Sequence, residues 1–184
     1  MFFLIIVIEE NNIMINLYDY IETIPDFPNK GILFRDITPL LSDVEAYRET
    51  CRQLSEYAKR IGAEVVAAPE ARGFIFGCPI ACEAGLKFVP IRKPDKLPRK
   101  TISYKYDLEY GNNELHMHED AIKPEEKVII VDDLLATGGT ADAAIKLVEQ
   151  LGGEVVGCGF VIELEDLKGR EKLAGYDVFS LLKY

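Results

Sequence analysis

Apolar residues follow two different periods along this 184-residue chain. Short runs rich in β-branched residues predict buried strands at residues 64–68, 88–91, 127–131, 155–162 and 178–182. Between these runs apolar residues recur with helical spacing, and they predict helices at residues 47–61, 73–84 and 141–151, each followed by glycine. Strands that alternate with helices predict an α/β fold with a mainly parallel central sheet and flanking helices.

Two further patterns lie outside this alternation. The run Ser42-Asp43-Val44-Glu45 has the spacing of a capping box, in which Ser42 is the N-cap of the first core helix. Residues 101–106 and 114–118 are typical of two arms of a β-hairpin, with its turn near residues 109–113. Ligands of α/β sheets bind where the strands end, so the loops that follow the predicted strands are candidate sites.

The charge of the chain narrows the classes of ligand. The formal net charge is -10, which opposes binding of nucleic acid by the surface as a whole. Six of the 21 basic residues nevertheless lie in one short segment: Arg92, Lys93, Lys96, Arg99, Lys100 and Lys105. This cluster indicates a local anionic ligand, although a solvated charged loop explains it equally well.

Neither the cysteines nor the N-terminal segment indicates export or a membrane anchor. The cysteines have no CxxC spacing and predict buried free thiols of a reducing cytoplasm: Cys51, Cys78, Cys82 and Cys158. The apolar run at residues 1–8 is too short to cross a bilayer and lacks the flanks of a signal peptide. We expect residues 1–13 to be an extension, or Met14 to be the start, and residues 14–184 to form a single domain.

The most informative motif follows the predicted strand that ends at Val131. Asp132 and Asp133 come first, and their carboxylates can accept hydrogen bonds from a vicinal diol or face a divalent ion. A loop of small and hydroxylated residues then leads into a helix that we expect to begin near Thr140. Its glycines let the backbone approach an anion, and a helix N-terminus attracts phosphate. The loop is neither a Walker A loop nor a dinucleotide fingerprint.

Two other segments can contact a ligand. Arg72 lies between a predicted strand and a helix, a position that suits pyrophosphate, although an arginine that only packs the loop also fits. Residues 27–36 contain aromatic residues that can stack on a purine, although core packing of Phe34 is an equal explanation. His116 and His118 share a strand face, but a metal site needs further ligands that the sequence does not suggest.

Taken in order, these segments resemble the type I phosphoribosyltransferases, which bind 5-phosphoribosyl-1-pyrophosphate (PRPP). The motif at residues 128–140 indicates the superfamily, and the Glu-Ala-Arg-Gly-Phe and Leu-Glu-Tyr-Gly runs at 70–74 and 108–111 resemble its adenine branch. The resemblance covers about residues 17–184. It implies the fold of that family, with a small N-terminal hood at about residues 24–41 and a mobile hairpin loop. It also implies transfer of the phosphoribosyl group from PRPP to adenine, giving AMP and pyrophosphate in purine salvage.

The resemblance also implies roles for individual residues. Those matched to PRPP are Arg72, Arg92, Lys96, Asp132, Asp133, Ala136, Thr137, Gly138, Gly139 and Thr140. Within this set the acid pair addresses the ribose hydroxyls, the loop holds the 5-phosphate, and the basic residues face pyrophosphate. The residues matched to the hood over adenine are Leu33, Phe34 and Arg35. A cis peptide is expected at Glu70–Ala71, as in the pyrophosphate loop of the family.

Catalysis, by the same resemblance, rests on Arg72 and on Glu109, which is matched to the acid–base residue of the mobile loop. Mg²⁺ is the implied cofactor, bound mainly through PRPP, so no protein cage of metal ligands is expected. The implied assembly is a cytoplasmic homodimer that binds neither nucleic acid nor membrane. Two alternatives stay open: a paralogue that uses hypoxanthine, guanine or xanthine, and a non-catalytic regulator that senses PRPP.

Overall fold

Five parallel strands form the central sheet of the computed structural model, which describes residues 15–107 and 112–184. Their order across the sheet is β4-β3-β7-β8-β9, and every neighbouring pair is parallel. The strands are β3 (Val65–Pro69), β4 (Lys87–Ile91), β7 (Lys127–Leu135), β8 (Glu154–Glu163) and β9 (Val178–Lys183). The predicted α/β fold with a parallel central sheet is therefore confirmed.

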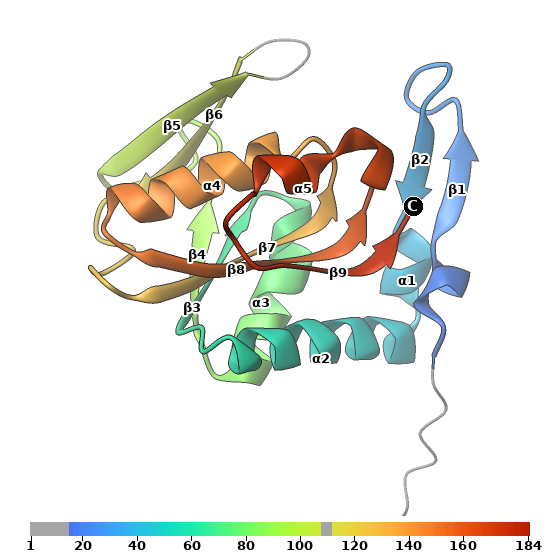
Figure 1. The fold of residues 1–184 in the computed structure, drawn as a ribbon, viewed down its shortest axis with the longest axis horizontal. Coiled ribbons are helices and arrows are strands. Elements are labelled where there is room, and N and C mark those ends of the chain that lie inside the picture. The colour runs from blue at the N-terminus through green and yellow to red at the C-terminus, as the bar shows by residue number, and fades with distance from the viewer. Residues whose placement is uncertain (1–14, 108–111) are drawn as a thin grey trace, which may run out of the picture. The chain divides into compact units, whose positions relative to one another are not determined.

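Helices cover both faces of this sheet (Figure 1). The helix α4 (Gly139–Gln150) lies on one face, while α3 (Arg72–Ala84) and α2 (Val44–Arg60) lie on the other. A short 3-10 helix, η2 (Glu165–Leu167), and α5 (Gly169–Lys172) connect β8 to β9. The predicted helices and strands are thus all present, with ends that differ by a few residues.

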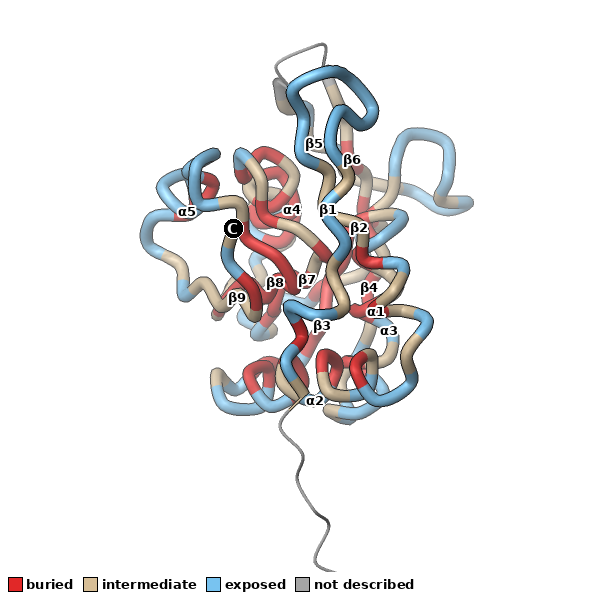
Figure 2. The backbone as a smooth tube through the Cα atoms, turned by 90° about the vertical axis from the view of Figure 1, so that its right-hand side faces the viewer, coloured by how far each residue is buried: buried red, intermediate tan, exposed pale blue. Residues whose placement is uncertain are grey.

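The core lies between the sheet and its helices. Side chains on successive strand positions point to opposite faces, so both faces of β3 and β7 are apolar and buried. The face toward α4 is formed by Val65, Ala67, Val128, Ile130, Cys158 and Phe160. In Figure 2 much of the tube along the central strands is red, the colour of buried residues.

The chain divides into two compact units, residues 1–47 and residues 48–184. The described part of the first unit contains η1 (Leu17–Tyr20), the strands β1 (Glu22–Pro25) and β2 (Leu33–Asp36), and α1 (Thr38–Ser42). The two strands pair in antiparallel fashion, with Glu22 opposite Asp36 and Pro25 opposite Leu33. This small hairpin lies in the region of the hood expected at about residues 24–41, and its role as a hood stays a prediction. The single domain expected over residues 14–184 stays a prediction.

The N-cap of α2 differs from the sequence expectation. Ser42 is the last residue of α1, and its hydroxyl donates to the carbonyl of Thr38 at 2.8 Å. Asp43 caps α2 instead, because its Oδ1 accepts from the backbone N–H groups of Glu45 and Ala46 at 3.1 and 2.9 Å. Aspartate and serine are nearly equivalent N-caps. Ser42 cannot cap α2 because it is part of the preceding helix α1.

A second hairpin joins β4 to β7. It consists of β5 (Thr101–Asp107) and β6 (Asn112–His118), paired from Thr101 opposite His118 to Asp107 opposite Asn112. The hairpin packs against the core of the second unit, to which it belongs, through buried Leu115 and Met117 of β6. A bridge between Arg92 and His116 attaches it to the end of β4. The hairpin predicted at residues 101–118 is thus present, with its base packed against the core.

The cysteines are only partly buried, contrary to expectation. Cys51 and Cys158 are buried, whereas Cys78 and Cys82 are exposed. The helix α3 buries one face, including Phe76 and Ile80, and Cys78 and Cys82 lie one turn apart on the other face. Apolar neighbours in the sequence therefore did not imply burial of these two thiols. Within the described residues no helix is both long and apolar enough to cross a membrane.

Candidate functional site

Two adjacent carboxylates lie near the carboxyl end of the central strand of the sheet. The strand β7 continues beyond Val131 through both acids to Leu135, whereas the sequence placed them in a loop. The reason is the neighbouring strand: its ladder with β8 runs on from Asp132 opposite Phe160 to Leu135 opposite Glu163. The ladder therefore fixes the backbone of both acids, and both side chains line the same pocket.

Burial makes this acid pair unusual. Asp133 is only 3% exposed, and its Oδ2 lies 2.9 Å from Nε of Arg72. Desolvation raises the pKa of Asp132 well above its ordinary value, and the negative charge of Asp133 adds to the effect. Desolvation also raises the pKa of Asp133, although the guanidinium of Arg72 opposes this rise. Ionisation of the two carboxylates therefore costs free energy in the empty site. A cation, or a ligand whose hydroxyls donate hydrogen bonds, can reduce that cost.

Arg72 reaches the acid pair from a neighbouring strand. It is the first residue of α3 and follows the end of β3, the strand next to β7 in the sheet. The peptide bond between Glu70 and Ala71 is cis, as expected from the resemblance. The Arg72 side chain is 46% exposed, so part of its guanidinium remains open to solvent while Nε contacts Asp133. The arrangement gives the site a positive group beside the two carboxylates.

The loop after β7 has a backbone geometry that suits an anion. Gly138 has φ 81°, which favours glycine, and α4 begins at Gly139, one residue earlier than expected. One pocket of about 190 Å³ brings together the groups predicted to bind PRPP: Arg72, Asp132, Asp133, Ala136, Thr137, Gly138, Gly139 and Thr140. The sequence prediction therefore located most of the pocket lining.

A backbone segment that the sequence did not single out supports this loop. A Cβ atom on Gly169 would lie 2.1 Å from the carbonyl oxygen of Ala136, and one on Gly138 would lie 2.7 Å from the carbonyl oxygen of Gly169. The loop and the start of α5 thus touch backbone to backbone, with no room for side chains. No motif marks Gly169, because its partner lies more than 30 residues earlier in the chain.

An ion pair fixes the segment that carries Gly169. Glu163, at the end of β8, is 4% exposed and accepts from Nε and Nη2 of Arg170 at 2.8 and 2.5 Å. Ser180 donates to the same carboxylate at 2.8 Å, and Nη1 of Arg170 donates to the carbonyl of Val178. Hydrogen bonds from Arg170 and Ser180 lower the pKa of Glu163, so the pair is charged and joins β8, α5 and β9.

The basic segment of the sequence is mostly paired with acids. Nε of Arg92 lies 2.5 Å from Glu70, and its Nη1 donates to the carbonyl of Lys96 at 3.4 Å. Ion pairs also join Arg99 to Asp120, Lys100 to Glu119 and Lys105 to Glu114. Among the described residues, no carboxylate lies within ion-pair distance of Lys93 or Lys96. Neither Arg92 nor Lys96 lines the 190 Å³ pocket, so their contact with PRPP stays a prediction.

The first unit presents an exposed apolar surface at its hairpin. Leu33 is 56% exposed and Phe27 is 52% exposed, and Phe34 packs edge-to-face on Phe27 with ring centroids 5.1 Å apart. Nη1 of Arg35 donates to the hydroxyl of Thr23 across the two strands. The hairpin therefore combines an aromatic pair with exposed apolar side chains, which suits contact with a planar ring.

Two other candidates have different outcomes. Glu109 lies outside the described residues, so its role stays a prediction. His116 has its Nδ1 3.1 Å from the Thr101 hydroxyl and its Nε2 3.3 Å from Glu114, whereas Nδ1 of His118 lies 3.3 Å from the carbonyl of Lys100. No cluster of three or more potential metal ligands occurs where the structure describes the chain.

Comparison with known proteins decides the family. Residues 41–182 match the model of the phosphoribosyl transferase domain. Adenine phosphoribosyltransferase of Lactobacillus gasseri is 60% identical over 170 residues, which cover 92% of this chain and 97% of that protein. The chain belongs to the adenine phosphoribosyltransferase family.

Solved structures agree with this assignment to the adenine phosphoribosyltransferases. The enzyme of Thermoanaerobacter pseudethanolicus superposes with a TM-score of 0.88 at 52% identity, covering 91% of this chain and 98% of that one. The enzyme of Saccharomyces cerevisiae, solved with adenine and an imino-altritol bisphosphate, gives a TM-score of 0.84 at 38% identity, covering 90% and 96%. The fold of the family therefore extends over nearly the whole chain.

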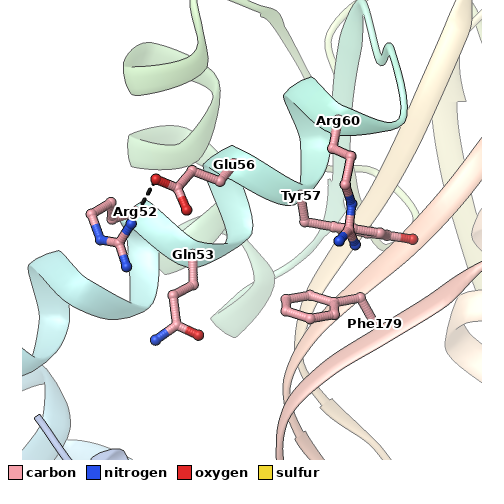
Figure 3. Close-up of a pocket in the computed structure, with 6 residues that line it drawn as sticks. All are labelled: Arg52, Gln53, Glu56, Tyr57, Arg60 and Phe179. Atoms are coloured by element: carbon pink, nitrogen blue, oxygen red, sulfur yellow. Dashed lines mark hydrogen bonds and ion pairs between the residues drawn. The ribbon is translucent and has the colours of Figure 1, made fainter. Parts of the chain in front are cut away.

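A larger pocket, of about 340 Å³, is lined by residues of α2 and by Phe179 of β9 (Figure 3), and none of the motif residues is among them. Its polar groups already have partners within the protein. Arg52 bonds Glu49 and Glu56, the Tyr57 hydroxyl donates to the carbonyl of Asp177, and the Arg60 guanidinium stacks 5.3 Å from the Tyr57 ring centroid. The side chains that line this pocket therefore pack α2 against β9, and few of their polar groups remain available to bind a ligand.

Substitution of Asp132 by asparagine is predicted to stabilise the ligand-free protein. The folded state binds the Asp132 proton more tightly than the unfolded state does, so the contribution of Asp132 to wild-type stability falls as the pH rises above about 4. Asp132→Asn removes this loss, and its melting temperature at about pH 7 should exceed that of the wild type. The difference should shrink as the pH approaches about 4 in thermal unfolding experiments.

The control for this experiment is Asp166→Asn, which changes an exposed acid of η2. Its melting temperature should follow that of the wild type at each pH. A lower melting temperature of Asp132→Asn at neutral pH would show that the acid pair is not under electrostatic strain.

Substitution of Gly169 by alanine is predicted to impair use of PRPP, because the new methyl group would displace the loop at Ala136. We expect a stability loss of about 1–3 kcal/mol from overpacking, together with a raised KM for PRPP. Gly85→Ala is the matched control: Gly85 has φ 72° and open space around its Cβ position, so it should lose about 1 kcal/mol without a change in KM. Equal KM values for PRPP in both variants would remove the supporting role of Gly169.

Proposed function

We propose that the chain transfers the 5-phosphoribosyl group of PRPP to N9 of adenine and forms AMP and pyrophosphate. One observation carries the proposal: a single pocket presents a guanidinium, two carboxylates and a phosphate-type loop in sequence. These groups are complementary to the pyrophosphate, the ribose diol and the 5-phosphate of PRPP, respectively. Membership of the adenine phosphoribosyltransferase family supports the same reaction.

The proposed contacts follow from the chemistry of each group. The 5-phosphate would bind to the backbone of residues 136–140 and to the first turn of α4, whose N–H groups and positive dipole end face the loop. The hydroxyls of the ribose would donate to Asp132 and Asp133. The exposed part of the Arg72 guanidinium would bind pyrophosphate, and Arg92 and Lys96 keep their proposed supporting role.

Adenine recognition is proposed for Leu33, Phe34 and Arg35 of the hood. The support comes from the aromatic pair of Phe27 and Phe34 and from the exposure of Leu33, because purines stack on aromatic and apolar surfaces. The yeast relative was solved as a complex with adenine, which supports the same base here. Hypoxanthine and guanine carry a 6-oxo group that adenine lacks. A site with hydrogen-bond donors aimed at that position would therefore reject adenine.

The reaction breaks the bond between C1 of the ribose and the pyrophosphate oxygen, and that oxygen keeps the electron pair. N9 of adenine forms the new bond to C1, and the N9 proton must leave. Arg72 would stabilise the negative charge that develops on pyrophosphate. Glu109, three residues after Tyr106, would accept the proton or share it with the purine.

Mg²⁺ is the cofactor that we propose for this site. The carboxylates of Asp132 and Asp133 are hard oxygen ligands of the kind that Mg²⁺ takes, and a cation would offset the desolvation that raises the pKa of each. When bound, the ion would neutralise charge on the pyrophosphate leaving group. Because the described residues offer no cluster of three ligands, PRPP oxygens would complete most of the coordination. The homodimer and the cytoplasmic location implied by the resemblance also stay predictions.

The reaction itself is the first prediction. Purified protein should form AMP from adenine and PRPP in the presence of Mg²⁺, measured by chromatography of the products. Hypoxanthine, guanine and xanthine, tested in parallel, should react far more slowly. If the protein turned over one of these bases faster than adenine, that base would replace adenine as the proposed substrate. PRPP binding without turnover of any base would favour a PRPP-sensing regulator.

The role proposed for Glu109 predicts a selective loss of turnover. Glu109→Gln removes the acid–base group but keeps its size, and kcat should fall about 10²–10⁴-fold. Glu109→Leu should behave similarly if the proton matters, and the affinities for adenine and PRPP should change much less. Steady-state kinetics of both variants distinguishes the roles: near-normal kcat for the glutamine variant, with loss only for leucine, would assign Glu109 to polar positioning.

A further inference from the structure

The hydroxyl of Tyr106 touches the phosphate loop from outside the pocket. Its oxygen lies 3.3 Å from Oγ1 of Thr140, the second residue of α4. Thr140 lines the 190 Å³ pocket, whereas Tyr106 does not. The contact therefore joins the β5–β6 hairpin to a group proposed to bind the 5-phosphate, and it does so without entering the phosphate site.

The base of the hairpin is anchored well enough to hold this contact. Ile102, Tyr104 and Tyr106 alternate along β5, so they share one face, and all three pack against the core cluster that includes α4. On the neighbouring strand, Leu115 and Met117 are buried in the same cluster. The ring of Tyr106 is thus held by packing, which leaves its hydroxyl directed at Thr140.

A threonine hydroxyl has one proton to donate and two lone pairs that accept. Threonine in a helix divides between two side-chain rotamers, so an unsupported Thr140 hydroxyl would lack a fixed direction. If the phenol of Tyr106 donates to Oγ1, the single proton of Thr140 stays available for a phosphate oxygen. Hydrogen bonds in such a chain also strengthen one another.

We propose that Tyr106 is a positioning residue for the 5-phosphate: it orients the Thr140 hydroxyl toward the phosphate that the loop binds. The proposal rests on the proposed function, which places the 5-phosphate in this loop. It predicts an effect limited to ligands that carry the 5-phosphate. Pyrophosphate, proposed to bind Arg72 instead, should be insensitive to Tyr106.

The test measures binding of ribose 5-phosphate and of pyrophosphate separately, by calorimetry on the full chain with Mg²⁺. Tyr106→Phe keeps the ring and its packing, and it should raise the Kd for ribose 5-phosphate about three- to tenfold, the usual effect of one hydrogen bond. Its Kd for pyrophosphate should equal that of the wild type. Tyr104→Phe is the matched control, because it removes a hydroxyl from the same face of the same strand and should leave both Kd values unchanged.

A double-mutant cycle separates positioning from simple packing. Thr140→Val removes the threonine hydroxyl with little change in shape, and on this background Tyr106→Phe should have no further effect on ribose 5-phosphate. Additive effects, or an equal change in pyrophosphate binding, would overturn the positioning role. Wild-type protein that fails to bind ribose 5-phosphate would overturn the proposed function as well, whereas equal binding by wild type and Tyr106→Phe would overturn only this inference.

Discussion

The site depends on two neighbouring carboxylates at the carboxyl end of a buried strand. Asp132 and Asp133 are fixed there because β7 keeps its ladder with β8 through both residues. Burial raises the pKa of each, and the guanidinium of Arg72 beside Asp133 opposes that rise. Such a pair is unfavourable in the empty site and becomes favourable once ligand hydroxyls or a cation approach. The charged pair therefore lowers the stability of the ligand-free protein and favours the binding of a ligand.

The parallel sheet explains why the remaining groups meet the acid pair. Neighbouring parallel strands end at the same edge, so Arg72 after β3 lies close to Asp133 on β7. The loop after β7 consists of small residues, and its backbone at Ala136 and Gly138 packs closely against Gly169 of α5. The Glu163–Arg170 ion pair holds that segment between β8 and β9. The phosphate site thus depends on residues that come well after the recognised motif.

The sequence was sufficient for the parts of this structure that follow local rules. Apolar runs located every strand of the central sheet, and the order of acids, glycines and threonines located the pocket lining. The end of β7 was placed too early, because the ladder with β8 extends the strand past its apolar run. The exposure of Cys78 was also missed, because it depends on which face of α3 packs against the sheet.

Contacts between distant segments had no signal in the sequence. Gly169 and Tyr106 lie far from the motif along the chain, and their proximity to Ala136 and Thr140 exists only after folding. Neither residue type is unusual for its local structure, so local pattern alone could not select them. Only tertiary packing brings these two residues to the loop after β7.

The proton balance of ligand binding tests the central role of the acid pair most directly. Ribose 5-phosphate with Mg²⁺ should be titrated into the protein in buffers of different ionisation enthalpy, between about pH 5 and pH 8. Because diol donors and Mg²⁺ favour the charged carboxylates, binding should release protons from the wild type, and Asp132→Asn should release fewer. Binding heats that do not depend on the buffer, or proton uptake, would contradict an acid pair whose charge is stabilised by its ligand.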